Sequence, residues 1–596
     1  MKEEYKVLDY GPADDRLTAD RHTNTHFPIT RFHSREEVDR RREELRFNLR
    51  MAAGLYPWPE KTPLNARYED VAEYDDYSVK KVMFESRPGF WSTGNLYLPK
   101  PLKPRQPAIL GVIGHWDPQR LTMQKEANYP RQLSNFARMG FITLVTDMIG
   151  KVDSLQITHE YGTGEEELWL SNGLGVQLWN NIRALDLLCA MPEVDAAHLG
   201  VTGSSGGGSQ SLFLALADDR ITACAPINMI SLHFQGGCRC ENAPGLRIGT
   251  NNGEMCAMIA PRALFLAGST GDWTKNQMTE EFPAVLEAFR QYGAEDKAEQ
   301  YYQVAGHQYN EKTRARVYDF FARNLMGKSL NWAEQPAPIE KMDMQDLTWF
   351  RGKGHAPGVG NDAEFLEAFS AERTRAVAAL PDAEKRRMLA WMTGINGEEP
   401  ATADPLIGEL DGMTLEKNSI NGGCGQQIPY IRLTPANWDG KRVCLALSGR
   451  GKECVDSPAV RAMLADGVAV VSGDLFLTGE FEGKEQTILG GERGESYYTT
   501  FHYTNHAFQA QDAALLWKAA KRYGTECSIW AEGCAARAAA CALPLLEGVS
   551  AACLEARALD IHGNAEYYRD FYVPGILELG GLEGCLKLAD CPITRF

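Results

Sequence analysis

The sequence contains neither an excess of basic residues nor a long apolar run. Lys and Arg number 62 against 79 Asp and Glu, which gives a formal net charge of −17. That balance argues against a protein that binds nucleic acid or an anionic membrane surface. No apolar run reaches the length of a membrane span, and residues 1–6 are charged and carry no apolar signal core. We therefore expect a cytoplasmic protein with neither a nucleic-acid nor a membrane partner.

Closely spaced cysteines are also scarce. The chain has 14 cysteines, but Cys238 and Cys240 form the only close pair. Others, such as Cys444 and Cys541, lie in apolar segments, which is typical of buried free thiols in a reducing compartment. No second pair and no histidine cluster in the sequence completes a zinc site around Cys238 and Cys240. We therefore expect no metal and no cofactor.

The chain is rich in short apolar runs that alternate with helical patterns. A chain of 596 residues is too long for one core, so at least two domains are expected. In the first half the alternation predicts an α/β fold, with a mostly parallel sheet covered by helices on both faces. The expected strands are residues 107–113, 141–146, 198–202, 221–226, 263–267 and 299–304.

One motif in this half indicates chemistry. Gly203-x-Ser205-x-Gly207 lies between the strand at 198–202 and a predicted helix at 210–217, which is the pattern of a nucleophile elbow. Small neighbours permit the tight turn, and the helix aims its first N–H groups at the serine hydroxyl. The alternative interpretation is a glycine-rich turn that precedes a helix.

A serine nucleophile needs a base, and the base needs an orienting acid. Asp272 follows the strand at 263–267, and His307 follows the strand at 299–304. This is the chain order Ser, acid, His of α/β-hydrolases. The alternatives are that Asp272 only caps a helix, that His307 is a surface-loop residue, and that Glu241 supplies the acid instead.

Further residues are expected around the triad. The N–H of Gly206, together with that of His115 or Trp116, is our candidate for the oxyanion hole. We predict that four side chains contact the substrate, although the aromatic ones could instead pack beneath the loops. These four are Trp116, Glu241, Trp273 and Tyr309.

Four stretches resemble a known family: residues 201–210, 233–245, 271–274 and 306–307. They are similar to stretches of the bacterial α/β-hydrolases of the acetyl xylan esterase-like group, near the dienelactone hydrolases. The resemblance covers roughly the first half of the chain, to residue 325. It implies an α/β-hydrolase fold, with Ser205 as nucleophile, Asp272 as acid and His307 as base. Ile113 departs from the histidine that often precedes the glycine of the oxyanion strand.

The second half repeats the pattern of the first. Residues 467–474 match residues 140–147, and Gly533 stands where Ser205 stands. Similar order over several elements predicts a tandem duplication with a truncated second copy; two unrelated α/β domains are the alternative. The predicted domains are an N-terminal arm and helix that pack on the catalytic domain (1–80), the catalytic α/β-hydrolase domain (81–330), a linker with helices (331–400) and a degenerate, non-catalytic copy (401–596).

We expect no catalysis in this second copy. Gly533 replaces the nucleophile, and Cys534 lies one position out of frame. Residues 591–596 match the start of the strand that precedes the acid, and the strand that precedes the histidine has no counterpart. A shortened sheet would leave an edge and an apolar face bare, so we expect it to pack against the first half or against another subunit.

These residues together predict a serine carboxylic ester hydrolase that works through an acyl-enzyme. The expected substrate is an acetylated or otherwise esterified carbohydrate, or a small-molecule ester. A prolyl oligopeptidase-like peptidase shares this triad, but that class usually adds a propeller, and the sequence shows no blade-length repeat. The other alternative is a binding or scaffold protein that works through its second half. The sequence leaves the acyl group, the alcohol and a homo-oligomeric state open.

Overall fold

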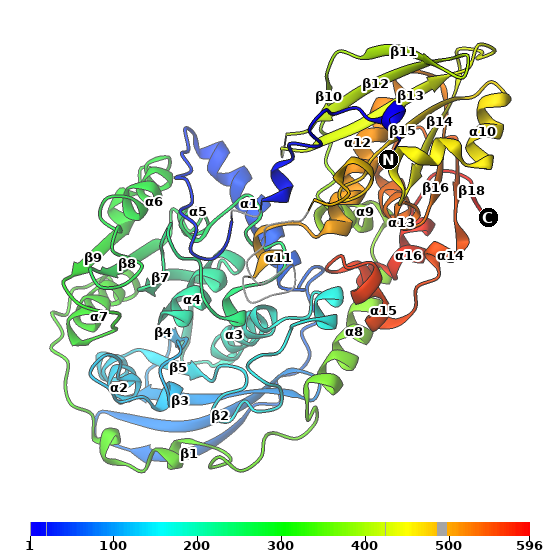
Figure 1. The fold of residues 1–596 in the computed structure, drawn as a ribbon. Helices are drawn as coiled ribbons and strands as arrows, with labels where there is room; N and C mark the ends of the chain where they lie inside the picture. The colour runs from blue at the N-terminus through cyan, green and yellow to red at the C-terminus, as the bar shows by residue number, and fades with distance from the viewer. Residues whose placement is uncertain (1, 19–20, 424, 485–496) are drawn as a thin grey trace. The chain divides into compact units, whose positions relative to one another are not determined.

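Residues 2–18, 21–423, 425–484 and 497–596 are described by the computed structural model of this chain. Their contacts divide the chain into two units (Figure 1). The larger unit consists of residues 23–166 and 170–369, and the smaller unit of residues 1–22, 167–169 and 370–596. The first 22 residues, which belong to the predicted N-terminal arm, fall in the smaller unit.

The larger unit contains a nine-stranded mixed sheet. In spatial order its strands are β1 (Arg67–Glu73), β2 (Tyr77–Arg87), β3 (Phe90–Pro99), β5 (Ile142–Thr146), β4 (Gln106–Gly111), β6 (Val194–Ser204), β7 (Ile221–Ile227), β8 (Ala263–Ser269) and β9 (Ala298–Gln303). The first three strands pair antiparallel, β3 is antiparallel to β5, and the strands from β5 onward are parallel. The larger unit thus has the α/β-hydrolase fold, and the predicted fold class is confirmed.

Helices precede, connect and follow the parallel strands of this unit. They are α1 (Arg35–Ala52), α2 (Tyr129–Met139), α3 (Gly173–Ala190), α4 (Gly206–Ala217), α5 (Asn252–Ala257), α6 (Glu281–Arg290) and α7 (Glu311–Met326). Four of them begin at an asparagine whose side chain accepts a hydrogen bond from the first turn, which satisfies an N–H that the helix leaves without an acceptor. These caps are Asn128, Asn172, Asn251 and Asn310.

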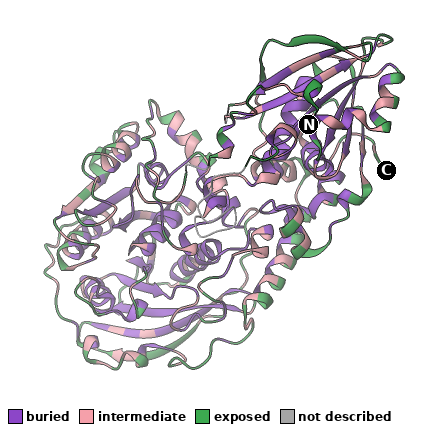
Figure 2. Cartoon of the chain, in the orientation of Figure 1, coloured by how far each residue is buried: buried purple, intermediate pink, exposed green. Residues whose placement is uncertain are grey.

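Apolar residues bury the parallel part of the sheet. Every residue of β5 and β8 is buried, as expected of strands that lie between two helical layers (Figure 2). On one face, α2 and α7 contribute Phe136, Tyr318 and Phe321 to a core shared with β7 and β8. The rigid sheet positions the loops at the carboxyl ends of its strands, where ligands meet parallel sheets.

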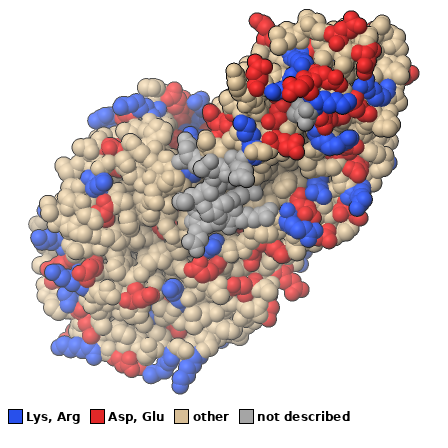
Figure 3. Space-filling view, in the orientation of Figure 1, with Lys and Arg blue, Asp and Glu red and all other residues tan. Residues whose placement is uncertain are grey.

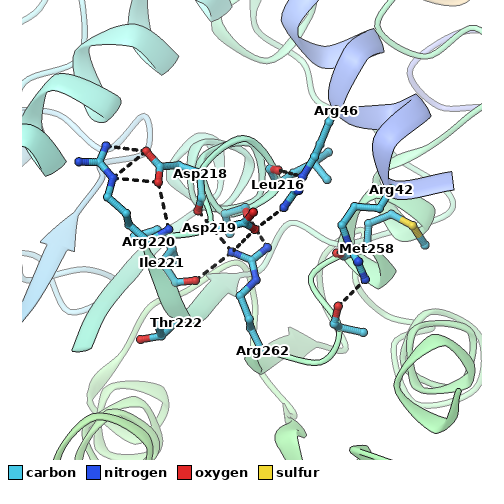
Figure 4. A network of polar contacts seen from close by, with 12 residues as sticks. Arg42, Arg46, Leu216, Asp218, Asp219, Arg220, Ile221, Thr222, Met258 and Arg262 are labelled. Atoms are coloured by element: carbon cyan, nitrogen blue, oxygen red, sulfur yellow. Dashed lines mark hydrogen bonds and ion pairs between the residues drawn. The ribbon is translucent and has the colours of Figure 1, made fainter. Parts of the chain in front are cut away.

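An arginine network fastens α1 at the opposite, amino end of these strands (Figure 4). Arg42 donates to the carbonyl of Met258 at 2.8 Å, and Arg46 pairs with Asp219. Arg262, just before β8, donates to the carbonyl of Ile221 at 2.9 Å. The network therefore joins α1 to the segments at the amino ends of β7 and β8.

The smaller unit repeats the topology. In spatial order its strands are β10 (Ala401–Thr402), β12 (Met413–Asn421), β13 (Gln427–Thr434), β15 (Ala469–Gly473), β14 (Arg442–Ser448), β16 (Glu526–Glu532), β17 (Ala551–Leu554) and β18 (Ile593–Arg595), and β11 (Leu406–Leu410) pairs with β12. From β12 to β18 the order is that of β2 to β8. Within the described residues, no strand takes the position that β9 has in the larger unit. This agrees with a duplicated fold whose second copy is shorter.

The remaining helices lie in the second part of the chain. They are α8 (Asp362–Ala378), which begins in the larger unit, α9 (Asp382–Thr393), α10 (Pro458–Ala465), α11 (Tyr498–Phe501), α12 (Asn505–Lys521), α13 (Cys534–Ala542), α14 (Ala556–Leu559), α15 (Gly563–Asp570) and α16 (Gly581–Lys587). Arg16 of the N-terminal arm is buried in this unit, where it pairs with Asp14 and Asp512 at 2.7 Å each. This buried triad attaches the arm to α12.

The surface shows charges of both signs. Figure 3 shows acidic and basic side chains intermixed over the visible face of the smaller unit. Among the described residues, no helix is both long enough and apolar enough to cross a membrane.

Candidate active site

Ser205 occupies a sharp turn between β6 and α4. Its backbone has φ 61° and ψ −126°, a combination that residues with a side chain rarely adopt. The flanking glycines are required here, because a Cβ at Gly203 would lie 2.2 Å from the carbonyl oxygen of Val112, and one at Gly207 would lie 2.5 Å from it. The close approach of the residue that follows β4 therefore explains the small residues of the motif and fixes the strained turn.

Asp272 and His307 form a pair at the carboxyl ends of β8 and β9. Nδ1 of His307 lies 3.0 Å from Oδ2 of Asp272, which is 2% exposed. The same carboxylate accepts hydrogen bonds from Asn228 at 2.7 Å and from the N–H of Thr274 at 2.8 Å. Because a carboxylate only accepts, Nδ1 of His307 donates this hydrogen bond, and Nε2 remains for another contact. Nε2 is buried and has no hydrogen-bond partner in the described part of the chain.

Two series of contacts link the Ser205 turn to the Asp272–His307 pair. The N–H of Ser205 donates to the carbonyl of Ile227 at 3.0 Å, and the next residue, Asn228, holds Asp272. On the other side, a Cβ at Gly114 would lie 3.2 Å from the Cβ of Ser205. Two residues further on, the ring of Trp116 stacks on that of His307 with centroids 5.2 Å apart. Both series lead from the serine to the Asp272–His307 pair.

The imidazole of His307 lies between two indoles. Besides Trp116, Trp273 contacts it at a centroid distance of 4.4 Å. Trp273 is itself held by Phe234, at a centroid distance of 4.4 Å, and by a hydrogen bond to the carbonyl of Asn228 at 3.1 Å. The two predicted aromatic residues Trp116 and Trp273 therefore both lie at the candidate site and fix the imidazole plane.

The predicted oxyanion donors lie next to the elbow. Gly206 is the first residue of α4, where a helix leaves its N–H groups without an intrahelical acceptor. The loop with His115 and Trp116 is pressed against the same turn, because a Cβ at Gly206 would lie 2.5 Å from Cε1 of His115. The N–H of Gly114 is engaged by the Tyr129 hydroxyl at 3.3 Å, which leaves His115 and Trp116 as the candidates from this loop.

Two predicted substrate contacts lie elsewhere. Tyr309 is 1% exposed, and its hydroxyl lies 2.8 Å from that of Thr202 in the core beneath the site. Glu241 is 4% exposed; its carboxylate accepts from Ser209 at 2.7 Å and from the N–H groups of Gly237 and Cys238. Burial raises the pKa of Glu241. We therefore withdraw both residues as substrate contacts, and Glu241 as the spare acid.

The chain was compared with protein families, curated proteins and solved structures. No protein-family model and no curated protein matches the chain. Methylesterase BT1017 is 22% identical with a TM-score of 0.46, over 60% of this chain and 77% of that one. A glucuronoyl esterase from Solibacter usitatus is 15% identical with a TM-score of 0.40, over 53% and 99%. An acetyl xylan esterase from Paenibacillus sp. R4 is 19% identical with a TM-score of 0.33, over 55% and 100%.

A cluster that the sequence analysis missed lies beside the elbow. His115 and His159 join Cys238 and Cys240, so the cysteine pair does have histidine neighbours. Hydrogen bonds from Cys240, His115 and His159 lower the pKa of the Cys238 thiol. The two histidines are remote from the pair in sequence and reach it through loops after β4 and β5, so spacing could not reveal them.

The smaller unit has an equivalent turn with glycine at its tip. Gly533 lies between β16 and α13 with φ 62° and ψ −144°, close to the values of Ser205. The N–H of Gly533 donates to Glu555 at 2.6 Å. Burial raises the pKa of the Cys534 thiol, which disfavours the nucleophilic thiolate.

Proposed function

We propose that the chain is a serine carboxylic ester hydrolase, with Ser205 as nucleophile, His307 as base and Asp272 as orienting acid. The observation that carries the proposal is the coincidence of two features at one end of one sheet. One is a serine held in the elbow conformation. The other is a histidine whose Nδ1 faces a buried carboxylate and whose Nε2 lacks a partner among the described residues.

In the proposed reaction, Nε2 of His307 takes the hydroxyl proton of Ser205 as Oγ attacks the ester carbonyl. The N–H groups of Gly206 and of His115 or Trp116 stabilise the tetrahedral oxyanion, and the helix dipole of α4 adds to them. His307 then gives the proton to the leaving alcohol, which departs from the acyl-enzyme. Water activated by the same nitrogen releases the acid and restores Ser205.

Asp272 has a defined part in this cycle. Its hydrogen bonds from Asn228 and Thr274 hold the carboxylate in place, so that it fixes the tautomer of His307 and favours the imidazolium formed during attack. The site needs no cofactor for these steps. Trp116 and Trp273 flank the imidazole, and their indoles suit a substrate with a sugar or aryl ring.

The experiment is a substrate panel on the full chain and two serine variants. p-Nitrophenyl acetate, acetylated xylan and methyl esters of uronic acids cover the ester classes, and a proline-linked peptide represents the peptidase alternative. We expect ester turnover, with kcat lowered about 10⁴-fold or more in Ser205→Ala and near wild type in the control Ser204→Ala. A fluorophosphonate should label Ser205.

Three outcomes would contradict the proposal. They are cleavage of the peptide but of no ester, loss of activity in Ser204→Ala but not in Ser205→Ala, and no turnover of any substrate. The last result would favour the scaffold alternative.

A further inference from the structure

Four metal-binding side chains converge beside the elbow from three separate segments. His115 follows β4, His159 follows β5, and Cys238 and Cys240 lie in the connection between β7 and β8. One ligand atom of each residue can be chosen so that all four atoms lie within 4.8 Å of one another. Nε2 of His159 is 3.1 Å from Sγ of Cys238, and Nε2 of His115 is 3.4 Å from Sγ of Cys240.

These distances suit a tetrahedral ion. With Zn–S of about 2.3 Å and Zn–N of about 2.0–2.1 Å, the N···S edge of a tetrahedron is about 3.5 Å. The two observed N···S distances lie near that edge. Two thiolates and two imidazoles in tetrahedral arrangement are typical of zinc, and a set of four protein ligands is typical of a structural site.

The surroundings orient the ligands. Nδ1 of His159 lies 2.9 Å from the carbonyl oxygen of Ile149, so Nδ1 carries the proton and Nε2 is available to a metal. Glu241 accepts from the N–H groups of Gly237 and Cys238, and Asn242 donates to the carbonyl of Cys238 at 2.8 Å. The loop is thus preorganised around its two thiols, and this gives buried Glu241 a role.

We propose that His115, His159, Cys238 and Cys240 bind one Zn²⁺ ion as a structural site. The ion would tie the loop that contains Gly114 and Trp116 to the β7–β8 connection and so hold it against Ser205. The metal takes no part in the chemistry of the triad, and the case for the ion does not rest on the proposed ester hydrolysis.

The first test measures metal in purified full-length protein by mass spectrometry of the elements. Wild type produced in zinc-supplemented medium and then desalted should contain about one zinc per chain. Cys238→Ser and His159→Asn each remove a ligand and should lower zinc affinity by about 100-fold or more. Cys189→Ser and His198→Asn lie outside the cluster and should retain zinc. Ser205→Ala should also retain it, which separates this site from catalysis.

A second measurement covers variants that fold poorly. Wild type stripped with a chelator should melt at a lower temperature and recover its melting temperature when Zn²⁺ is restored. Co²⁺ in place of Zn²⁺ should give the charge-transfer absorption of a thiolate ligand. Three outcomes would overturn the proposal. They are wild type that contains no zinc, wild type that contains iron or copper instead of zinc, and a disulfide between Cys238 and Cys240, detected by intact mass before and after reduction.

Discussion

The two elbows of this chain have nearly the same backbone and different residues at the tip. Ser205 lies at φ 61°, ψ −126°, and Gly533 at φ 62°, ψ −144°. A residue with a side chain pays about 1–3 kcal/mol to occupy such a region, whereas glycine adopts it readily. The larger unit therefore retains strain where the nucleophile is proposed, and the smaller unit has the turn without the strain.

The residues that flank the two tips differ in the opposite sense. The larger unit has Gly203 and Gly207, whose Cβ positions are blocked by the carbonyl of Val112. The smaller unit has Ala531 and Ala535 at the corresponding positions, both fully buried. The neighbouring strand therefore approaches the first elbow more closely than the second. The packing is thus closer at the elbow for which a nucleophile is proposed.

A third feature is shared by both units. Asp147 follows β5 and pairs with Arg120 at 2.9 Å, and Asp474 follows β15 and pairs with Lys452; all four side chains are fully buried. The pair persists in the unit whose elbow lacks a serine. We infer that it supports the fold and takes no part in catalysis.

The largest effect is expected when the tip of the first elbow is given the residue of the second. Ser205→Gly should lower kcat by about 10⁴- to 10⁶-fold, because the nucleophile is lost. The same change should raise stability by about 1 kcal/mol, because glycine relieves the strain at φ 61°. Ester turnover and thermal unfolding check the two parts. An active variant, or an inactive one of lower stability, would contradict this account.

Substitutions at the positions that flank the tip should have the next largest effect. Gly203→Ala places a Cβ against the Val112 carbonyl and should cost about 1–3 kcal/mol. The displaced turn should also lower kcat/KM by about 100-fold. The reverse change, Ala531→Gly, should cost about 1 kcal/mol and leave turnover unaltered. Equal tolerance of alanine at Gly203 would show that the two elbows are packed alike.

The reciprocal change at the second tip should have a smaller effect. Gly533→Ser introduces a side chain at φ 62°, with the nearest obstacle to its Cβ 3.7 Å away, so only backbone strain of about 1–3 kcal/mol is expected. Hydrogen exchange should localise the loss to β16 and α13. Cys534→Ser, one position on, should be near neutral. A Ser205→Ala background keeps the first site silent, and ester turnover gained there would show that the second unit retains a catalytic base.

The smallest effect is expected at the buried ion pair that both units share. Burial raises the pKa of Asp147 to about 6, above the value of about 3.9 in an unfolded chain. Between about pH 4 and 6 the folded state then binds the extra proton, so this group lowers stability as the pH rises through that window. Asp147→Asn has no carboxyl at this position and should not show that loss. The difference in unfolding free energy between the variant and wild type should therefore change by about 1–2 kcal/mol from pH 4 to pH 6.

The pKa of Asp474 is also raised by burial, so Asp474→Asn should change stability with the same sign. Chemical unfolding at a series of pH values would show this. An unchanged difference between wild type and Asp147→Asn from pH 4 to 6 would contradict the account.

Local patterns predicted much of this molecule. Apolar runs revealed the parallel strands, and the GxSxG frame pointed to Ser205, because strand burial and tight turns leave short-range marks in a sequence. The pairing of Asp272 with His307 followed from chain order and from the strand ends at which the two residues lie. Their roles in catalysis remain predictions.

Other features depend on contacts between distant segments. Tyr309 follows His307 by two residues, yet the chain turns it inward to Thr202, which no spacing rule could indicate. His115 and His159 reach Cys238 across three loops. The N-terminal arm gave no sign that its partner would be Asp512.

The contact between Arg16 and Asp512 has a consequence for folding during synthesis. Arg16 and Asp512 are separated by 496 positions. At a synthesis rate of about 5–20 residues per second, the arm waits for about 25–100 s before α12 leaves the ribosome. The larger unit can fold within that interval, whereas the smaller unit combines residues that precede the larger unit with residues that follow it. During translation the arm is therefore an exposed segment that a protease or chaperone can reach.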